Sequence, residues 1–261
     1  KDGKKYVPET YAYLTMSNLS KIASLLGKKE DGSYYGDMAE KMKDAFAKGV
    51  IQSDGKMPVE VMGSYVLPLH YGLVPEDLRK SFIETIIRKI DENGGCLDTG
   101  FLATPILLDT LCENGHTKKA YDLLFQDKCP SWLYEVDHGA TTIWESWITA
   151  NPDGSPMSVS LNHYAFGCVD DWMFRNICGL SPMLPGYRKF KVQPVLDDRI
   201  SSAKRTFEST YGKITVDWIK KDGRFDMKVD VPSGSEALIV LPDGQTFEKG
   251  SGSYSFSCKA A

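Results

Sequence analysis

A single carboxylate stands among aromatic side chains near the middle of the chain. Glu145 lies in the run 139–147, Gly-Ala-Thr-Thr-Ile-Trp-Glu-Ser-Trp, between Trp144 and Trp147 and with no cationic residue close to it in the sequence. A carboxylate in such surroundings is costly unless it is hydrogen-bonded or has a chemical role. Hydrolysis of a glycoside uses two carboxyl groups, and in an inverting enzyme one protonates the leaving oxygen while the other activates water. Glu145 is therefore a candidate general base.

The sequence alone leaves other interpretations of this segment open. Glu135 and Asp137 lie close by and compete with Glu145 for the role of the base. A structural carboxylate that accepts hydrogen bonds from Thr141 or Thr142, or caps a backbone turn, fits the same residues, since buried polar groups are usually paired.

Tryptophan is concentrated around this carboxylate. Four of the five tryptophans lie between positions 132 and 172: Trp132, Trp144, Trp147 and Trp172. Aromatic rings can stack on the C–H faces of sugars, and a cleft lined by them is typical of a ligand site. An ordinary aromatic core cluster explains the composition equally well.

Helices must position these residues, because apolar side chains recur at helical spacing through about the first 180 positions. Caps, glycines and prolines divide the pattern into about seven helices joined by short turns. Asp37 is expected to be the N-cap of the second of them. The stretch 127–157 is predicted to be irregular, and a loop of that length in a compact domain is usually functional. The predicted helices cover 10–28, 37–49, 59–70, 75–93, 104–114, 117–126 and 158–178.

Beyond position 185 the apolar pattern changes to period two with many β-branched residues. Strands are predicted at 190–192, 214–218, 225–231 and 237–241, separated by Gly, Asp and Pro turns at the short spacing of an antiparallel sandwich. The sequence therefore predicts two domains, a helical one over 1–184 and a β domain over 185–261.

Composition and charge exclude several classes of protein. The chain has 261 residues, 35 acidic and 31 basic side chains and a net charge of −4, and the excess of acid lies in the helical part, so we expect no nucleic-acid partner. No apolar run approaches the roughly 20 residues of a membrane span, so we expect no membrane partner. The sequence has no CxxC pair, no Gly-rich phosphate loop and no HExxH motif, so no metal and no cofactor are expected. A neutral, polyhydroxylated substrate fits best.

Three runs, in this order, carry a resemblance to a known family: 97–105 (Leu-Asp-Thr-Gly-Phe-Leu-Ala-Thr-Pro), 139–147 and 160–167 (Ser-Leu-Asn-His-Tyr-Ala-Phe-Gly). Together with Pro130-Ser131-Trp132 and Pro185-Gly186-Tyr187, they resemble the C-terminal part of bacterial α-L-rhamnosidases, glycoside hydrolase family 78. The resemblance extends over essentially the whole chain.

The resemblance implies a mainly α fold followed by an all-β one, namely a partial (α/α)6 toroid of antiparallel helical hairpins and a C-terminal antiparallel β-sandwich. It implies inverting hydrolysis of terminal α-L-rhamnosides, with a rhamnose-containing glycoside as the partner. The Glu of the T-T-I-W-E motif is the family's general base and matches Glu145. Five further residues match motif positions that line or support the sugar site: Asp98, Phe101, Trp132, Trp144 and His163. Trp147 joins them from the aromatic cluster.

Ordinary structural roles remain open for two of these residues. Asp98 could be an N-cap before the helix 104–114, and a lone histidine such as His163 is often a satisfied structural residue.

The chain departs from the family pattern in one respect, since a closed (α/α)6 toroid has about twice as many helices. The segment that supplies the family's general acid has no counterpart in these residues, so we expect the chain to be inactive alone and to self-associate through the open face of the half-toroid. A non-catalytic carbohydrate-binding helical module is an alternative. A second alternative is another (α/α)6 glycosidase that acts on α-glucosides or uronates. The stretch 130–165 has no Arg or Lys that would attract a uronate.

Overall fold

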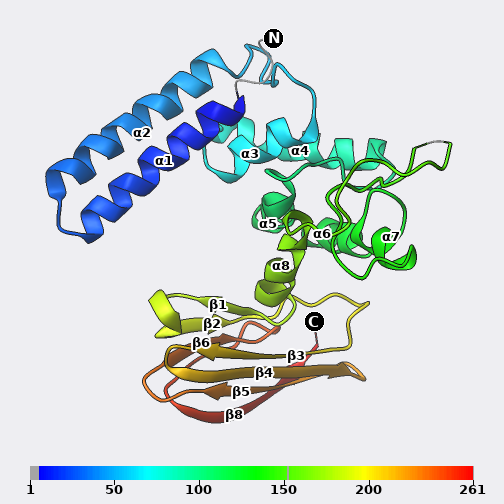
Figure 1. Cartoon of the computed structure of the whole chain (residues 1–261). Helices are drawn as coiled ribbons and strands as arrows, with labels where there is room; N and C mark the ends of the chain where they lie inside the picture. Colours follow the sequence, from blue (N-terminus) through cyan, green and yellow to red (C-terminus); the bar gives the residue numbers. More distant parts are fainter. Residues whose placement is uncertain (1–5, 152, 261) are drawn as a thin grey trace. The chain divides into compact units, whose positions relative to one another are not determined.

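The computed structural model describes residues 6–151 and 153–260, which form two compact units that meet between Gly167 and Cys168. Helices make up the first unit and sheets most of the second (Figure 1). The predicted fold class, mainly α followed by all-β, is therefore confirmed. The boundary predicted after residue 184 stays a prediction.

Seven α-helices lie in the described part of the first unit, and the first six pack as successive pairs, α1 with α2, α3 with α4 and α5 with α6. The core of this unit is centred on α3, in which every residue from Ser64 to Leu69 is buried. The helices are α1 Tyr6–Leu25, α2 Lys29–Gly49, α3 Met62–His70, α4 Glu76–Glu92, α5 Thr104–Glu113, α6 Thr117–Leu124 and α7 Trp132–Asp137.

The N-cap predicted at Asp37 is wrong, because α2 begins eight residues earlier, at Lys29. Two glycines inside α2 explain the difference. A Cβ on Gly32 would come within 2.7 Å of the Ser24 hydroxyl oxygen of α1, and a Cβ on Gly36 within 3.1 Å of the Ser20 hydroxyl oxygen. These glycines serve the close approach of two helices and do not mark a turn.

The helix predicted over 158–178 is also wrong for its first half. Residues 158–164 are not helical, a 3-10 turn η2 covers Ala165–Cys168, and α8 covers only Val169–Asn176. Residues 160 and 163 form backbone hydrogen bonds with residues 145 and 143 in place of helical ones. The stretch predicted to be irregular holds one short helix, α7.

The second unit holds α8 and two four-stranded sheets (Figure 1). One sheet has the order β1-β2-β6-β7, in which only the β2–β6 pair is parallel, and the other has the antiparallel order β3-β4-β5-β8. The indole N–H of Trp218 in β4 donates to Ile177 O at 2.9 Å, which fastens the end of α8 to the second sheet. The strands are β1 Leu180–Pro182, β2 Lys189–Val192, β3 Ser202–Ser209, β4 Gly212–Lys221, β5 Arg224–Val231, β6 Glu236–Val240, β7 Thr246–Lys249 and β8 Gly252–Lys259.

Candidate functional site

Three segments of the first unit, 97–104, 129–147 and 160–166, converge around the tryptophans. Hydrogen bonds outside regular secondary structure join them: Leu97 N to Pro130 O at 3.1 Å, the Trp147 indole N–H to Thr99 O at 3.2 Å, and the Trp132 indole N–H to Phe166 O at 2.8 Å. These segments coincide with the three sequence runs that carried the resemblance. The structure therefore brings residues 70 positions apart into one site.

The buried side of this site is formed by Trp132, Glu135, Trp147 and Phe166, which we call the inner group. The rings of Trp147 and Phe166 are stacked with centroids 3.9 Å apart, and Trp132 meets Trp147 edge-on at 5.6 Å. Because both indole N–H groups donate to backbone carbonyls, these tryptophans hold the segments together as core side chains do.

Phe101 and Tyr164 are exposed, Glu145 and His163 are half-buried, and we call these four residues the outer group. Phe101 is 42% exposed and Tyr164 88%. The His163 ring lies between these two aromatic rings, stacked on Phe101 at 4.8 Å and on Tyr164 at 5.0 Å. Ala165 N–H donates to His163 Nδ1 at 3.2 Å, so in the neutral ring the proton is on Nε2, which remains a donor for a ligand hydroxyl.

Glu145 is held by the backbone of a facing residue. Ser160 N–H donates to Glu145 Oε2 at 2.7 Å, and Glu145 N–H donates to Ser160 O at 2.9 Å. This reciprocal pair fixes one carboxylate oxygen, in accord with the expectation that the carboxylate is hydrogen-bonded, although its donor is neither Thr141 nor Thr142. A carboxylate held by one donor keeps lone pairs that can accept a proton from water.

The Glu145–Ser160 pair belongs to a long hairpin. His163 N–H donates to Ile143 O at 2.8 Å, and toward the tip Met157 N–H donates to Thr149 O at 2.8 Å. This hairpin turns at its tip between Asn151 and Ser155 and is the extended loop at the right of Figure 1. The base candidate therefore lies on a paired segment, well away from the tip.

Glu135 in α7 is the second carboxylate of the site, and it is only 2% exposed. Its Oε2 accepts the backbone N–H of Trp144 at 3.2 Å, whereas Oε1 has no hydrogen-bond partner among the described residues. Burial raises the pKa of Glu135, and the bond from Trp144 opposes this only in part. Glu135 faces the backbone that precedes Glu145 and is enclosed, so it is not open to substrate.

The other predicted site residues lie at the edges of this arrangement. Trp144 is buried, and its peptide N–H is the group that Glu135 holds. Asp98 is exposed, and both of its neighbours in the chain are hydrogen-bonded to the segment 129–147. It is not the N-cap of α5, because that position is Ala103. Asp137, the other competitor for the base, is exposed at the end of α7.

Sequence reasoning missed two contributors to the site. Phe166 stacks on Trp147 and contacts Phe101 edge-on at 5.2 Å, so it joins the inner and outer groups. Ser160 contacts Glu145 through its main-chain N–H and carbonyl groups. Every residue type except proline has both groups, so the sequence gives no sign of this role. The signal for Phe166 was present, because it stands in the run 160–167.

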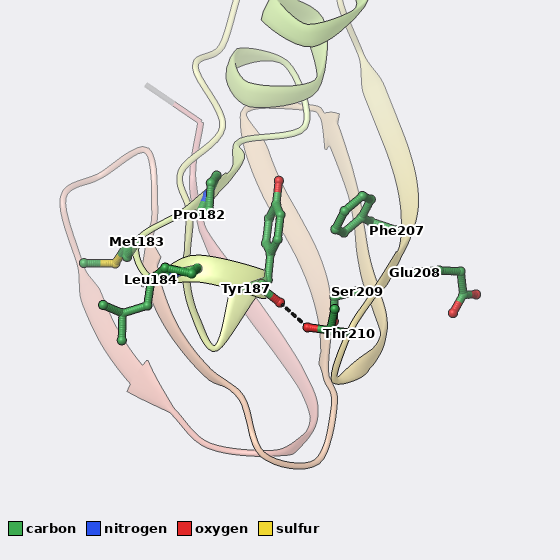
Figure 2. Close-up of a pocket in the computed structure, with 10 residues that line it drawn as sticks. Pro182, Met183, Leu184, Tyr187, Phe207, Glu208, Ser209 and Thr210 are labelled. Carbon is green, nitrogen blue, oxygen red and sulfur yellow. Dashed lines mark hydrogen bonds between the residues drawn. The ribbon is translucent and has the colours of Figure 1, made fainter. Parts of the chain in front are cut away.

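A separate cavity of about 510 Å³ lies in the second unit, between the β1–β2 connection and the end of β3 (Figure 2). The rings of Tyr187 and Phe207 stand 4.6 Å apart beside it, and Tyr187 has the unusual φ of 63°. Its Ser209 and Thr210 hydroxyls donate to backbone carbonyls. The cavity lining is mostly apolar and holds no arrangement of groups that resembles the first site.

Neither a metal site nor a membrane-spanning helix emerges from the described residues. Their His, Cys, Asp and Glu side chains nowhere gather in a group of three or more that could hold an ion. None of the helices in the described ranges is both long and apolar enough to cross a bilayer.

Helical hairpins that present a carboxylate among aromatic rings, followed by a β unit, are consistent with the glycoside hydrolase class. Comparison with known families makes this specific. Residues 1–177 match the bacterial α-L-rhamnosidase six-hairpin glycosidase domain, and residues 179–255 match the bacterial α-L-rhamnosidase C-terminal domain. The chain belongs to the bacterial α-L-rhamnosidase family.

Individual relatives agree with this assignment. An α-L-rhamnosidase of Streptomyces avermitilis is 37% identical in an alignment 260 residues long that covers 91% of this chain, and one of Formosa agariphila is 35% identical over 85% of it. The crystal structure of the Streptomyces avermitilis enzyme complexed with L-rhamnose has a TM-score of 0.91 at 35% identity over 97% of this chain, and that of the Aspergillus terreus enzyme 0.89 at 32% over 95%. The chain spans about a quarter of the length of the curated relatives, and 27% and 30% of these two solved chains.

Proposed function

We propose that this chain supplies the general base and part of the sugar pocket of an inverting α-L-rhamnosidase. Glu145 removes a proton from water as the water attacks the anomeric carbon of a terminal L-rhamnose, with inversion. The outer group, with Asp98, lines the pocket, and His163 Nε2–H donates to a sugar hydroxyl. The inner group and Trp144 support it.

The observation that carries the proposal is the half-buried Glu145 carboxylate, which is fixed by Ser160 N–H on the same hairpin that holds His163. The bond from Ser160 N–H orients the carboxylate before substrate arrives, and such preorganisation is what a general base needs. The His163 ring stacks on Phe101, and such a pair offers an apolar face that suits the C–H face of a pyranose. Membership of the rhamnosidase family supports rhamnose as the sugar.

We further propose that the general acid comes from outside these residues. A base alone cannot also protonate the departing oxygen on the opposite face of the ring. Of the other carboxyl groups in these segments, Glu135 is enclosed, and Asp98 and Asp137 are exposed to solvent. The 261-residue chain by itself is therefore expected to be inactive on rhamnosides with poor leaving groups.

We also propose that the chain alone self-associates through the open face of the half-toroid, with exposed apolar residues of the first helical pair contributing. The end of α1 presents Ile22, Leu25 and Leu26 to solvent, with Leu25 87% exposed. Apolar side chains gathered at one place on a surface favour association.

The decisive experiment is Glu145→Gln in the complete polypeptide that contains this chain, assayed on an aryl α-L-rhamnoside. Loss of general-base help should lower kcat by about 10²–10⁴-fold and leave KM little changed. Asp153→Asn, at the hairpin tip, is the matched control and should keep wild-type turnover. Proton NMR of the first-formed product should show β-L-rhamnose.

Three results would contradict the proposal. A Glu145→Gln variant with wild-type kcat removes Glu145 from the reaction. First-formed α-L-rhamnose excludes inversion. A polypeptide that binds rhamnosides and hydrolyses none of them is a carbohydrate-binding module.

A further inference from the structure

Glu135 is a buried carboxylate for which the proposed reaction has no direct use. Taking a carboxylate out of water costs several kcal/mol unless its oxygens are paired, and Oε1 of Glu135 is buried with no partner among the described residues. A leucine at this position would remove that cost. The residue is therefore poorly explained as a contribution to stability.

Among the described residues, the Glu135 side chain makes one hydrogen bond, and it points to a different use. Its Oε2 accepts the N–H of Trp144, the residue immediately before Glu145. The main-chain carbonyl of Glu135 also accepts Ala140 N–H at 2.9 Å, so α7 holds the segment 139–147 at its start and near its middle. The next residue, Glu145, is held by Ser160 through the reciprocal pair.

We propose that Glu135 is a positioning residue for the base. Its carboxylate fixes the Trp144 N–H, and this sets the direction in which the next side chain, Glu145, leaves the backbone. The role rests on the proposed function of Glu145, since Glu135 touches neither substrate nor water in the reaction.

The α7 helix itself is well placed for this role. Ser131 caps it by accepting Tyr134 N–H at 3.1 Å, and the Trp132 indole anchors its first turn to Phe166 O. Glu135 therefore extends from an element that is fixed at its start. A displacement of about 1 Å at a catalytic group can cost about a hundredfold in rate, so an anchor next to the base has a measurable effect.

The experiment compares Glu135→Leu, Glu135→Gln and the control Asp137→Leu in the complete polypeptide. Glu135→Leu removes the acceptor, and we expect kcat on an aryl α-L-rhamnoside to fall about ten- to a hundredfold while KM stays within about threefold. Glu135→Gln keeps an acceptor oxygen and should restore kcat to within about threefold of wild type. Asp137→Leu, on the same helix but exposed, should leave both constants unchanged.

Hydrogen–deuterium exchange supplies a readout that does not depend on activity. The amide of Trp144 should exchange faster in Glu135→Leu than in wild type or Glu135→Gln, and peptides elsewhere in the first unit should be unchanged. If Glu135→Leu does not fold, Glu135→Asp replaces it, because the shorter side chain withdraws the acceptor and keeps the charge. The same loss of kcat is expected.

The outcomes separate this inference from the proposed function. A wild-type polypeptide that hydrolyses no rhamnoside refutes the function, and the role of Glu135 with it. An active enzyme in which Glu135→Leu keeps its kcat refutes the positioning role alone. The positioning role is also refuted if kcat falls only because less of the Glu135→Leu enzyme is folded. It is refuted as well if Glu135→Gln, which keeps an acceptor oxygen, loses as much kcat as Glu135→Leu.

Discussion

The inner and outer groups of the proposed sugar site use the same residue types in opposite ways. In the inner group, Trp132 and Trp147 are buried, and their indole N–H groups are bonded to the backbone. In the outer group, Phe101 and Tyr164 reach solvent, and both stack on the ring of His163. Nδ1 of His163 accepts a backbone N–H, which leaves the Nε2–H group as the donor that could reach a ligand.

Glu135 of the inner group and Glu145 of the outer group differ in the same way, in burial and in hydrogen bonding. Glu135 is enclosed and holds a backbone N–H, whereas Glu145 is half-buried and is itself held by one. The proposed site therefore divides into a buried support and an exposed surface for ligand, and the direction of the hydrogen bonds separates the two better than the residue types do. The following substitutions test that separation.

Trp147→Ala should have the largest effect on stability. It removes a stacked, buried ring and the bond to Thr99 O, so we expect a loss of about 3–5 kcal/mol in the free energy of unfolding. Urea denaturation of the complete polypeptide, followed by fluorescence, measures it. A loss below about 1 kcal/mol would show that Trp147 is not a support.

Phe101→Ala should have a smaller effect, and on a different quantity. The ring is partly exposed and stacks on His163, so stability should fall by less than about 1 kcal/mol. Rhamnose affinity, measured by calorimetry, should fall by about 0.5–1.5 kcal/mol, the usual contribution of a stacked ring. Unchanged rhamnose affinity would place Phe101 outside the sugar pocket.

The smallest expected effect is a pH-dependent drift of stability caused by Glu135. Burial raises its pKa above the ordinary value of 4.5, so above pH 4.5 the folded chain retains a proton that the unfolded chain releases. The free energy of unfolding of wild type, relative to Glu135→Gln, should therefore fall as pH rises through this interval and become constant above the raised pKa. Denaturation of both proteins across the interval checks it, and parallel pH profiles would contradict it.

The regular elements could largely be predicted from the sequence, because their apolar periodicity reflects their burial. The helix predicted at 104–114 and the observed α5 agree to within one residue, and the strand 225–231 to within one. The predicted start of the second helix was wrong because the residue types there reflect packing against the first helix. Gly32 and Gly36 resemble helix breakers until Ser20 and Ser24 of α1 are seen beside them.

The site was predictable in part. The T-T-I-W-E motif indicated Glu145, and the structure adds which atoms hold it. The helix expected over 158–178 failed because residues 160–163 pair with 143–145, and such long-range pairing leaves no local period in the sequence. The burial of Trp132 and Trp147 was equally hidden, since a tryptophan in a loop-rich stretch can face either the interior or solvent.

The hairpin that carries Glu145 has a paired base, which holds Glu145, and a tip whose length can change. Its paired residues, 143 with 163 and 145 with 160, lie at the base of the loop, while at the tip Asn151 and residues 153–155 are exposed and Asp153 bonds to Ser155. Insertions or deletions at the tip would leave the register at the base intact, because exposed loop tips tolerate changes in length. Natural variation and laboratory libraries can therefore remodel the tip without rebuilding the site.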